Sequence, residues 1–269
     1  MKKIFLVALF LIYSTISSAN ELSNKISEYV AGCIPGEGIT EASVELRDNN
    51  EGSGNYQFSI HTQEINDDKR FVGNLGLGYR FLNPDESFMF GSNVFYDTDI
   101  QEGHKRIGYG LEAKAAIVDF SFNQYLKTTN QKVISGTKEQ ILSGNDYNIS
   151  SQVPYMPWST FNLQGYRYEN EKASNDQKGY IYSLENMLNP SLQFNIELDN
   201  SSISGVKDEH NYEFVFIYPP QEKEYSLSKK AISDVAFEKK NMQAALKDKV
   251  RRNNNLTVEI QGSVIFTSK

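Results

Sequence analysis

The stretch Asn-Leu-Gly-Leu-Gly-Tyr-Arg-Phe, residues 74–81, alternates strictly between two kinds of side chain. Its odd positions hold Leu75, Leu77, Tyr79 and Phe81, and its even positions hold Asn74, Gly76, Gly78 and Arg80. Because successive side chains of a β-strand point to opposite faces, the stretch predicts a strand with one apolar and one polar face. Such an apolar face meets a protein core in a soluble sheet and lipid in a membrane barrel.

The same two-residue period recurs from residue 55 to about residue 218. In the clearest further case, residues 192–199, Leu, Phe, Ile and Leu alternate with Gln, Asn, Glu and Asp. Asn-Pro pairs at 83–84 and 189–190 mark two of the turns between such segments. We count about ten segments of the length that a tilted membrane-crossing strand needs, and residues 128–170 leave room for two more. The sequence therefore predicts an all-β, antiparallel sheet.

Two features favour lipid over a protein core. The predicted strands exceed the about 5 or 6 residues that are usual in soluble sheets. Aromatic residues also recur at strand ends, where the aromatic girdles of membrane barrels lie. They are Phe81, Tyr96, Tyr125, Tyr168, Tyr212 and Tyr218. A secreted soluble β-protein remains the alternative, because amphipathic strands occur in both classes.

The amino terminus predicts export. Residues 1–19 combine two lysines, an apolar run at 4–13 and a small-residue cleavage site at 17–19, as in a secretory signal peptide. The run is shorter than the about 20 residues of a membrane-spanning helix. Cys33 is the one cysteine of the chain, which excludes an intramolecular disulfide. A formal net charge of -7 argues against a nucleic-acid partner, which requires a basic surface.

The pattern changes after the two prolines at 219–220. Residues 226–249 place apolar side chains at helix-like spacing, with Ser226 or Ser228 as N-cap, and the following residues return to an extended pattern. The expected division is a signal peptide at 1–19, an amino-terminal segment at 20–54, an amphipathic β-sheet at 55–220, a helix at 221–249 and an extended tail at 250–269.

Three segments carry a resemblance to a known family. Residues 74–81 with 91–99 (Gly-Ser-Asn-Val-Phe-Tyr-Asp-Thr-Asp) resemble the first hairpin of the translocator domain of the intimin and invasin group, the inverse autotransporters. Residues 106–112 resemble the strand that follows, and residues 250–259 (Val-Arg-Arg-Asn-Asn-Asn-Leu-Thr-Val-Glu) resemble the linker that passes through the pore.

The resemblance implies a transmembrane β-barrel of about 12 strands at 55–220 in the outer membrane, after a periplasmic amino-terminal segment at 20–54. It also implies a helical pore plug at 221–249 and an extended linker in the pore at 250–269. It implies anchoring in outer-membrane lipid and passage of a carboxy-terminal segment to the cell surface, which in the family supports adhesion. The implied partners are the barrel-assembly machinery and periplasmic chaperones. Because the sequence ends at Lys269, three alternatives are open: a truncated gene product, a minimal barrel, or one half of a split system whose partner is a separately encoded passenger. The alternatives are a small porin or solute channel, and a soluble secreted β-domain that binds a ligand.

Three groups of residues are candidates for the functional site. The lumen-facing candidates are Asn74, Gly76, Gly78, Arg80, Asn93, Asp97 and Glu112. The linker candidates are Arg251, Arg252, Asn253, Asn254 and Asn255. The resemblance also implies an assembly strand with Phe214, Phe216 and Tyr218. The polar lumen residues either hydrogen-bond the inserted segment or are solvated in a wet pore, and the two glycines leave space for that segment.

No catalytic or metal site is expected. His61, His104 and His210 lack the spacing of a metal site or a Ser-His-Asp triad, and solvated loop positions are expected for the last two. The glycine-rich run 73–78 lacks the strand-to-helix context and the Lys-Ser/Thr pair of a phosphate loop. The sequence therefore predicts a protein that is not an enzyme and that needs no cofactor.

Overall fold

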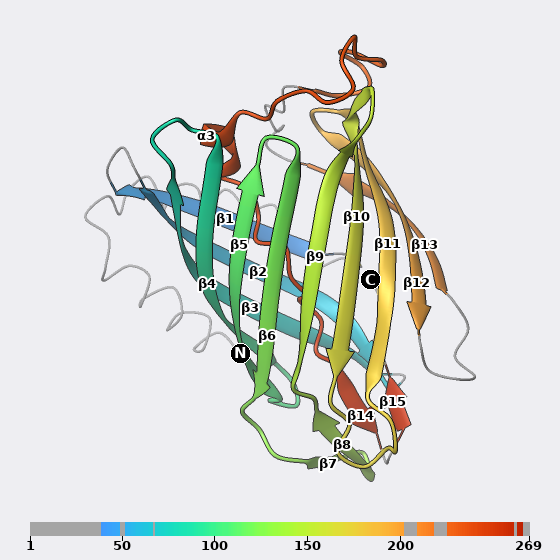
Figure 1. Cartoon of the computed structure of the whole chain (residues 1–269). Coiled ribbons are helices and arrows are strands. Elements are labelled where there is room, and N and C mark those ends of the chain that lie inside the picture. Colours follow the sequence, from blue (N-terminus) through green and yellow to red (C-terminus); the bar gives the residue numbers. More distant parts are fainter. Residues whose placement is uncertain are drawn as a thin grey trace.

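The computed structural model describes residues 39–48, 52–66, 68–201, 209–217, 225–260 and 263–265. The predicted signal peptide, Cys33 and Tyr218 lie outside the described residues. Strands make up nearly all of the regular structure (Figure 1). Within the described part of the chain, no helix is both long and apolar enough to cross a membrane.

Eleven strands form one antiparallel sheet in which almost every strand pairs with its neighbours in the sequence. The strands are β1 Ile39–Asp48, β2 Gly52–Ile65, β3 Asp68–Leu82, β4 Phe88–Asp99, β5 Lys105–Ala115, β6 Val118–Lys127, β9 Gly144–Val153, β10 Met156–Tyr168, β11 Gln177–Asn189, β12 Leu192–Ser201 and β13 Glu209–Phe216. Only β6 and β9 are separated by a further hairpin. The prediction of an all-β, antiparallel sheet is confirmed.

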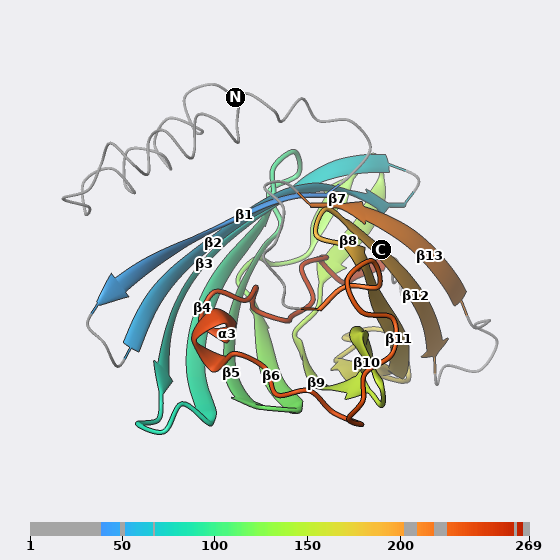
Figure 2. The ribbon, with the colours of Figure 1, turned by 90° about the horizontal axis from the view of Figure 1, so that it is seen from above.

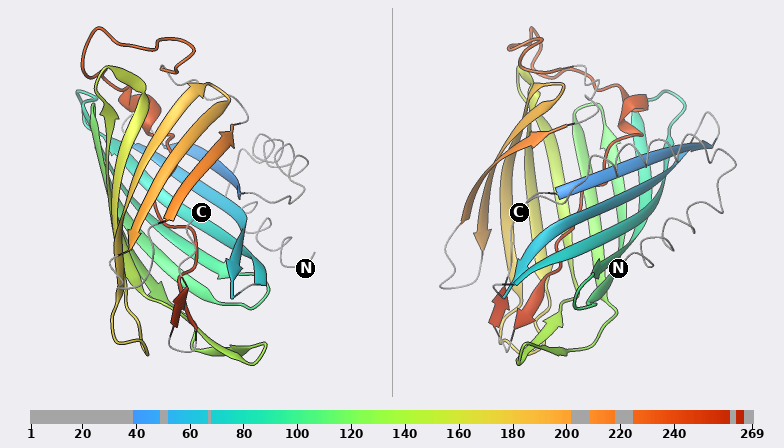
Figure 3. Two further views of the ribbon diagram at one scale, coloured as in Figure 1. Left: turned by 90° about the vertical axis from the view of Figure 1, so that its right-hand side faces the viewer. Right: turned by 180° about the vertical axis from the view of Figure 1, so that it is seen from behind.

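The sheet curls around a lumen, as the view from above shows (Figure 2). Strand β1 pairs with β2 and strand β13 pairs with β12, so these two strands form the edges. They lie on either side of an open seam (Figure 3). Closure requires a tilt and stagger that bring the first and last strands side by side. The described residues therefore show eleven strands in an open sheet, where about 12 strands in a closed barrel were expected.

The sheet begins earlier in the chain than expected. Residues 39–48 and 52–54, which were assigned to a periplasmic segment, form β1 and the start of β2, with pairing from Ile39↔His61 to Asp48↔Gly52. A sequence signal exists here, because residues 42, 44 and 46 are apolar and alternate with polar residues. Consequently the hairpin of β3 and β4, which was expected to be the first, follows an earlier hairpin of β1 and β2.

The two faces of the sheet have the opposite polarity from those of a soluble protein. On the inner face Arg80, Asp97 and Arg106 are at most 1% exposed. On the outer face Leu77 is 53% and Leu111 is 61% exposed. A broad exposed apolar surface is unstable in water and suits contact with lipid. The alternative of a soluble secreted β-domain does not fit this arrangement.

Four short strands form a second sheet at one end of the large one (Figure 1). They are β7 Lys132–Ile134, β8 Thr137–Ile141, β14 Val258–Ile260 and β15 Ser263–Ile265, in the order β15-β14-β8-β7. The hairpin of β7 and β8 lies between β6 and β9, whereas β14 and β15 belong to the predicted linker. The second sheet therefore joins the linker to a loop of the large sheet.

The longest described connections of the large sheet, 128–143 and 169–176, lie at one of its ends. The end with the second sheet carries the loops 100–104, 128–143 and 169–176, and we call it the loop end. The opposite end carries short turns such as 116–117 and 154–155, and we call it the turn end. An apolar cluster lies at each end. At the loop end it consists of Ile65, Val72, Ile141, Leu256, Val258 and Ile260, and at the turn end of Leu82, Met89, Met242, Ala245 and Leu246.

The helix expected over residues 226–249 is reduced to a single short helix. This is α3, Met242–Ala245, whose N-cap Asn241 accepts hydrogen bonds from the backbone N–H groups of Gln243 and Ala244. Residues 225–241 consist of turns, bends and irregular backbone that cross the turn end (Figure 1). The apolar spacing in this segment was therefore a misleading helix signal.

The physical reason is that other partners satisfy the backbone of this segment. Tyr155 N–H donates to the Ala236 carbonyl, and Ser233 N–H donates to the Tyr155 carbonyl, both at 2.8 Å. The Ser233 hydroxyl accepts from the Val235 N–H at 3.1 Å. Serine side chains that bond the nearby backbone compete with the helix ladder. The turn between β9 and β10 thus hydrogen-bonds backbone groups of this segment that would pair with one another in a helix.

Candidate functional site: the linker in the lumen

The linker enters the lumen beside α3 and runs to the loop end (Figures 1 and 2). Residues 246–257 contain no regular strand, and pairing begins where β14 meets β8. Every residue from Asn254 to Ile260 is buried. Buried backbone N–H and C=O groups require hydrogen-bond partners, so those of the linker depend on the lumen wall.

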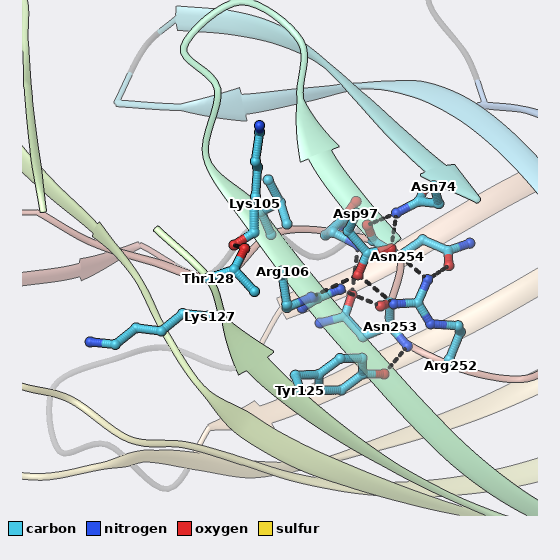
Figure 4. Close-up of polar contacts among 12 residues, drawn as sticks. Asn74, Asp97, Lys105, Arg106, Tyr125, Lys127, Thr128, Arg252, Asn253 and Asn254 are labelled. Carbon is cyan, nitrogen blue, oxygen red and sulfur yellow. Dashed lines mark hydrogen bonds and ion pairs between the residues drawn. The ribbon is translucent and has the colours of Figure 1, made fainter. Parts of the chain in front are cut away.

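Arg252 is held by the Asp97 carboxylate (Figure 4) and by two aromatic rings. Its guanidinium donates two hydrogen bonds to Asp97, at 3.0 and 2.6 Å. The same group lies 4.1 Å from the centroid of the Phe95 ring and 5.5 Å from that of Tyr125. Arg106 donates to Asp97 at 2.8 Å. Two arginines therefore share one carboxylate in the wall.

A second buried carboxylate, Asp146, faces the next linker residue. It accepts hydrogen bonds from the Tyr125 hydroxyl at 2.6 Å, the Asn123 amide at 2.7 Å and the Asn253 N–H at 3.3 Å. The Tyr125 hydroxyl also accepts from the Asn253 N–H at 2.8 Å. The Asn253 side chain donates to the Tyr168 hydroxyl at 2.6 Å. Asn253 is thus bound through both its backbone and its side chain.

Side chains of the wall supply the hydrogen-bond partners that a neighbouring strand would otherwise give to the linker backbone. The Gln63 amide donates to the Leu256 carbonyl at 2.7 Å and accepts from the Leu256 N–H at 2.8 Å. The Asn74 amide donates to the Asn254 carbonyl at 3.1 Å. Further bonds join Arg106 to the Asn253 carbonyl, Asn123 to the Arg251 carbonyl and Gln57 to the Val250 N–H.

The remaining linker candidates also contact the wall. Both terminal nitrogens of Arg251 donate to Glu185, at 2.6 and 3.0 Å. The Asn255 side-chain oxygen lies 2.8 Å from Nε2 of His61. All five residues singled out in the linker therefore make hydrogen bonds inside the sheet.

The polar lumen candidates lie on the inner face and are buried. Asn74 and Asp97 contact the linker directly, as described above. Arg80 forms a bidentate pair with Glu112, at 2.7 and 2.9 Å, and donates to the carbonyls of Leu246, at 2.9 Å, and Asp248. Asn74, Asp97 and Arg80 therefore hydrogen-bond the inserted segment, whereas Glu112 bonds Arg80 and Asn93 lies on the same inner face.

The two glycine candidates leave space for neighbouring side chains of the wall and not for the linker itself. A Cβ atom on Gly76 would lie 2.2 Å from the Phe95 ring, and one on Gly78 would lie 2.6 Å from the Asn55 side-chain oxygen. Direct space for the linker is provided at Gly108, where a Cβ atom would lie 3.3 Å from the Arg252 guanidinium. The linker thus reaches Gly76 only indirectly, because Arg252 stacks on Phe95.

The candidate assembly strand is β13. Phe214 is 60% and Phe216 is 83% exposed on the outer face of this edge strand. Tyr218, the third residue of that group, lies outside the described residues. The structure thus presents aromatic side chains outward along one edge of the sheet.

Several site residues were not identified from the sequence. Tyr125 and Tyr168 were assigned to outer girdles, but both are fully buried at the linker. The parity of β6 gives a signal for Tyr125, because it shares odd positions with Asn123 and not the even positions of Phe120 and Phe122. Nothing local distinguishes His61, Asp146 and Glu185, whose partners lie far away in the sequence.

At the loop end a charged cluster joins the hairpin of β7 and β8 to the large sheet. Arg70 donates to both carboxylate oxygens of Glu139, at 2.6 and 2.7 Å. His104, expected in a solvated loop, is fully buried with Nε2 3.7 Å from Glu139. Burial, and then the positive charge of Lys132, lower the pKa of His104 below its usual value. Among the described residues, no group of three or more His, Cys, Asp or Glu side chains is placed to hold a metal ion.

Comparisons with known proteins agree with this geometry. The family model for the β-domain of inverse autotransporters matches residues 40–254. Invasin of Yersinia enterocolitica is 28% identical over 45% of this chain and 15% of its own length. The inverse autotransporter adhesin YeeJ of Escherichia coli K12 is 25% identical over 76% of this chain and 9% of its own. Intimin of Citrobacter freundii is 32% identical over 34% of this chain and 10% of its own.

A solved structure from work on the in-meso crystallization of membrane proteins supports the fold. It covers 84% of this chain and 96% of its own length with a TM-score of 0.64, at 20% identity. An outward apolar face and a peptide-filled polar lumen define a β-sheet domain of the membrane type. The chain belongs to the inverse autotransporter β-domain family. This family comprises adhesin-type outer-membrane proteins, which are not enzymes, and the chain spans less than a sixth of the three relatives named above.

Proposed function

We propose that this chain anchors itself in the bacterial outer membrane and carries a carboxy-terminal segment through its lumen to the cell surface. The observation that carries the proposal is the extended linker, which runs through a polar lumen from one end of the sheet to the other. In this function the exposed apolar face lies in lipid. The sheet closes in the membrane, because lipid cannot satisfy the backbone groups of free strand edges.

The lengths of the connections suggest the direction of the linker. Membrane barrels of this type have short periplasmic turns and longer extracellular loops. The turn end is therefore assigned to the periplasm and the loop end to the cell surface. Since the linker runs from α3 at the turn end to β14 at the loop end, it reaches the outer side of the membrane at β14 in this assignment.

The partners follow from this assignment. An exported membrane sheet requires periplasmic chaperones and the barrel-assembly machinery. Strand β13, with its outward aromatic residues, is the strand that this machinery would recognise. The named relatives include an invasin and an adhesin. Display of an adhesive passenger beyond the linker, in the same chain or a separate one, is therefore the proposed use of the exit.

A small porin is less well supported, because linker residues and wall residues hydrogen-bond to one another across the lumen. Deletion of residues 225–269 should raise the single-channel conductance of the purified protein in planar bilayers. Deletion of residues 261–269 alone is the matched control and should leave conductance low, because it keeps the linker from Val250 to Ile260. Equal conductance of the full chain and the longer deletion, with both folded by heat-dependent gel migration, would contradict a linker that fills the lumen.

A further inference from the structure

The exit of the linker is built from two elements outside the lumen wall. The first is β8, which pairs antiparallel with β14 in the register Val258↔Ile141, Glu259↔Gln140 and Ile260↔Glu139. The linker thereby becomes an added strand on the hairpin of β7 and β8. Strand addition of this kind supplies affinity through main-chain hydrogen bonds and specificity through side-chain pockets.

The second element is the loop 169–176 between β10 and β11. Three successive backbone N–H groups of this loop donate to the Glu259 carboxylate: Glu171 at 3.1 Å, Lys172 at 3.0 Å and Ala173 at 2.7 Å. Successive N–H groups that converge in this way form a concavity for an anion. Glu259 is only 2% exposed, so its carboxylate relies on these donors.

The charges around Glu259 favour the same arrangement. Lys127 forms an ion pair with Glu171 and also attracts the Glu259 carboxylate. A buried carboxylate is costly unless it is hydrogen-bonded and balanced by a positive charge. A shift of β14 by one residue would turn Glu259 to the other face of the strand. The loop thus stabilises a single register of the linker on β8.

We propose that β8 and the backbone N–H groups of residues 171–173 form a capture site for the emerging polypeptide. Its ligand is an extended segment with a carboxylate side chain at one position, here residues 257–260 with Glu259. Occupation of the site holds the exported chain in one register and prevents it from sliding back into the lumen. This inference rests on the proposed function, because it takes the loop end to be the cell surface.

The test uses the full chain in outer membranes, with an epitope tag after Lys269 and with Cys33→Ser to remove the native thiol. Ile141→Cys and Val258→Cys place two thiols at directly paired positions of β8 and β14. We expect a disulfide to form on mild oxidation. Adding Glu259→Gln should slow its formation by about tenfold, since hydrogen bonds to a charged group are lost. Glu259→Asp, which keeps the charge, should restore part of the rate.

Glu169→Gln is the matched control, because Glu169 begins the same loop but is exposed. It should leave the disulfide rate unchanged. Equal disulfide rates with and without Glu259→Gln, while the tag stays exposed on intact cells, would overturn the capture site and leave the proposed function standing. A tag that is shielded in the parent chain would instead overturn the proposed function and the capture site with it.

Discussion

At the scale of single residues, buried charges define the position of the linker. The side chains of Arg252 and Asp97 are 1% and 0% exposed. Removing one member of a buried ion pair leaves the other charge without compensation, which destabilises a protein far more than loss of a surface pair. Because Asp97 also bonds Arg106 and Asn74, the wall presents a prepared site for one guanidinium of the linker.

Gly76 offers a test of how tightly that site is packed. Gly76→Ala places a Cβ atom 2.2 Å from the Phe95 ring, and this ring is fixed between β3 and Arg252. Overpacking of this kind costs about 1–3 kcal/mol. Urea unfolding in detergent micelles should show this loss for Gly76→Ala. The control Gly73→Ala on the same strand should change stability little, since its nearest neighbour would be 3.6 Å away; equal losses would contradict the packing argument.

The sequence predicts the face of each of these residues but not its partner. Strict alternation in β3 and β4 was enough to assign Asn74, Arg80 and Asp97 to the polar face. The pairing of Asp97 with Arg252 joins residues 155 positions apart, and no local pattern contains that information. The same holds for Gly76. The Phe95 ring occupies the space above this glycine only because the register of β3 and β4 pairs the two residues.

At the scale of elements, the hairpin of β7 and β8 depends on a buried charged cluster. Arg70 on β3 binds Glu139 on β8, and His104, in the loop before β5, lies beside Glu139. Thr129 Oγ1 lies 3.5 Å from His104 Nδ1, and Asp99 and Lys132 act on the same imidazole. The hairpin that receives the linker is therefore attached through groups that are sensitive to charge.

Acid should weaken this attachment. The pKa of His104 is lowered in the folded protein, mainly by burial, so the unfolded chain takes up the proton at a higher pH. The contribution of His104 to the free energy of unfolding is therefore present above about pH 6.5 and falls as the pH drops toward the folded pKa. Urea unfolding at about pH 7.5 and about pH 5.5 should show a smaller pH dependence in His104→Gln than in the parent. An identical pH dependence would exclude this role for His104.

Elements that depend on tertiary contacts were the least predictable. The segment 225–241 has helix-like spacing, yet the turn between β9 and β10 takes its backbone hydrogen bonds. Strand β1 was missed because its alternation is short and rich in charge. Strands β3, β4 and β12, by contrast, were readable because their period-2 patterns are long and uninterrupted.

At the scale of the whole molecule, the polar inner face of the sheet and the linker inside it depend on each other. A polar inner face needs water or a polar occupant, and the linker supplies donors and acceptors along the length of the lumen. The apolar clusters near α3 and β14 then fix the linker at both ends. The sequence predicted the amphipathic sheet and the extended linker, whereas closure and strand number depend on pairing between distant strands.

Export through the lumen is tested most directly by the location of an epitope tag after Lys269 in intact cells, with outer-membrane fractionation as the control. We expect a protein in the outer-membrane fraction whose tag is accessible to antibody and removed by external protease. A membrane-embedded protein whose tag is accessible only after the cells are broken would place the linker's end in the pore or the periplasm and contradict export through the lumen.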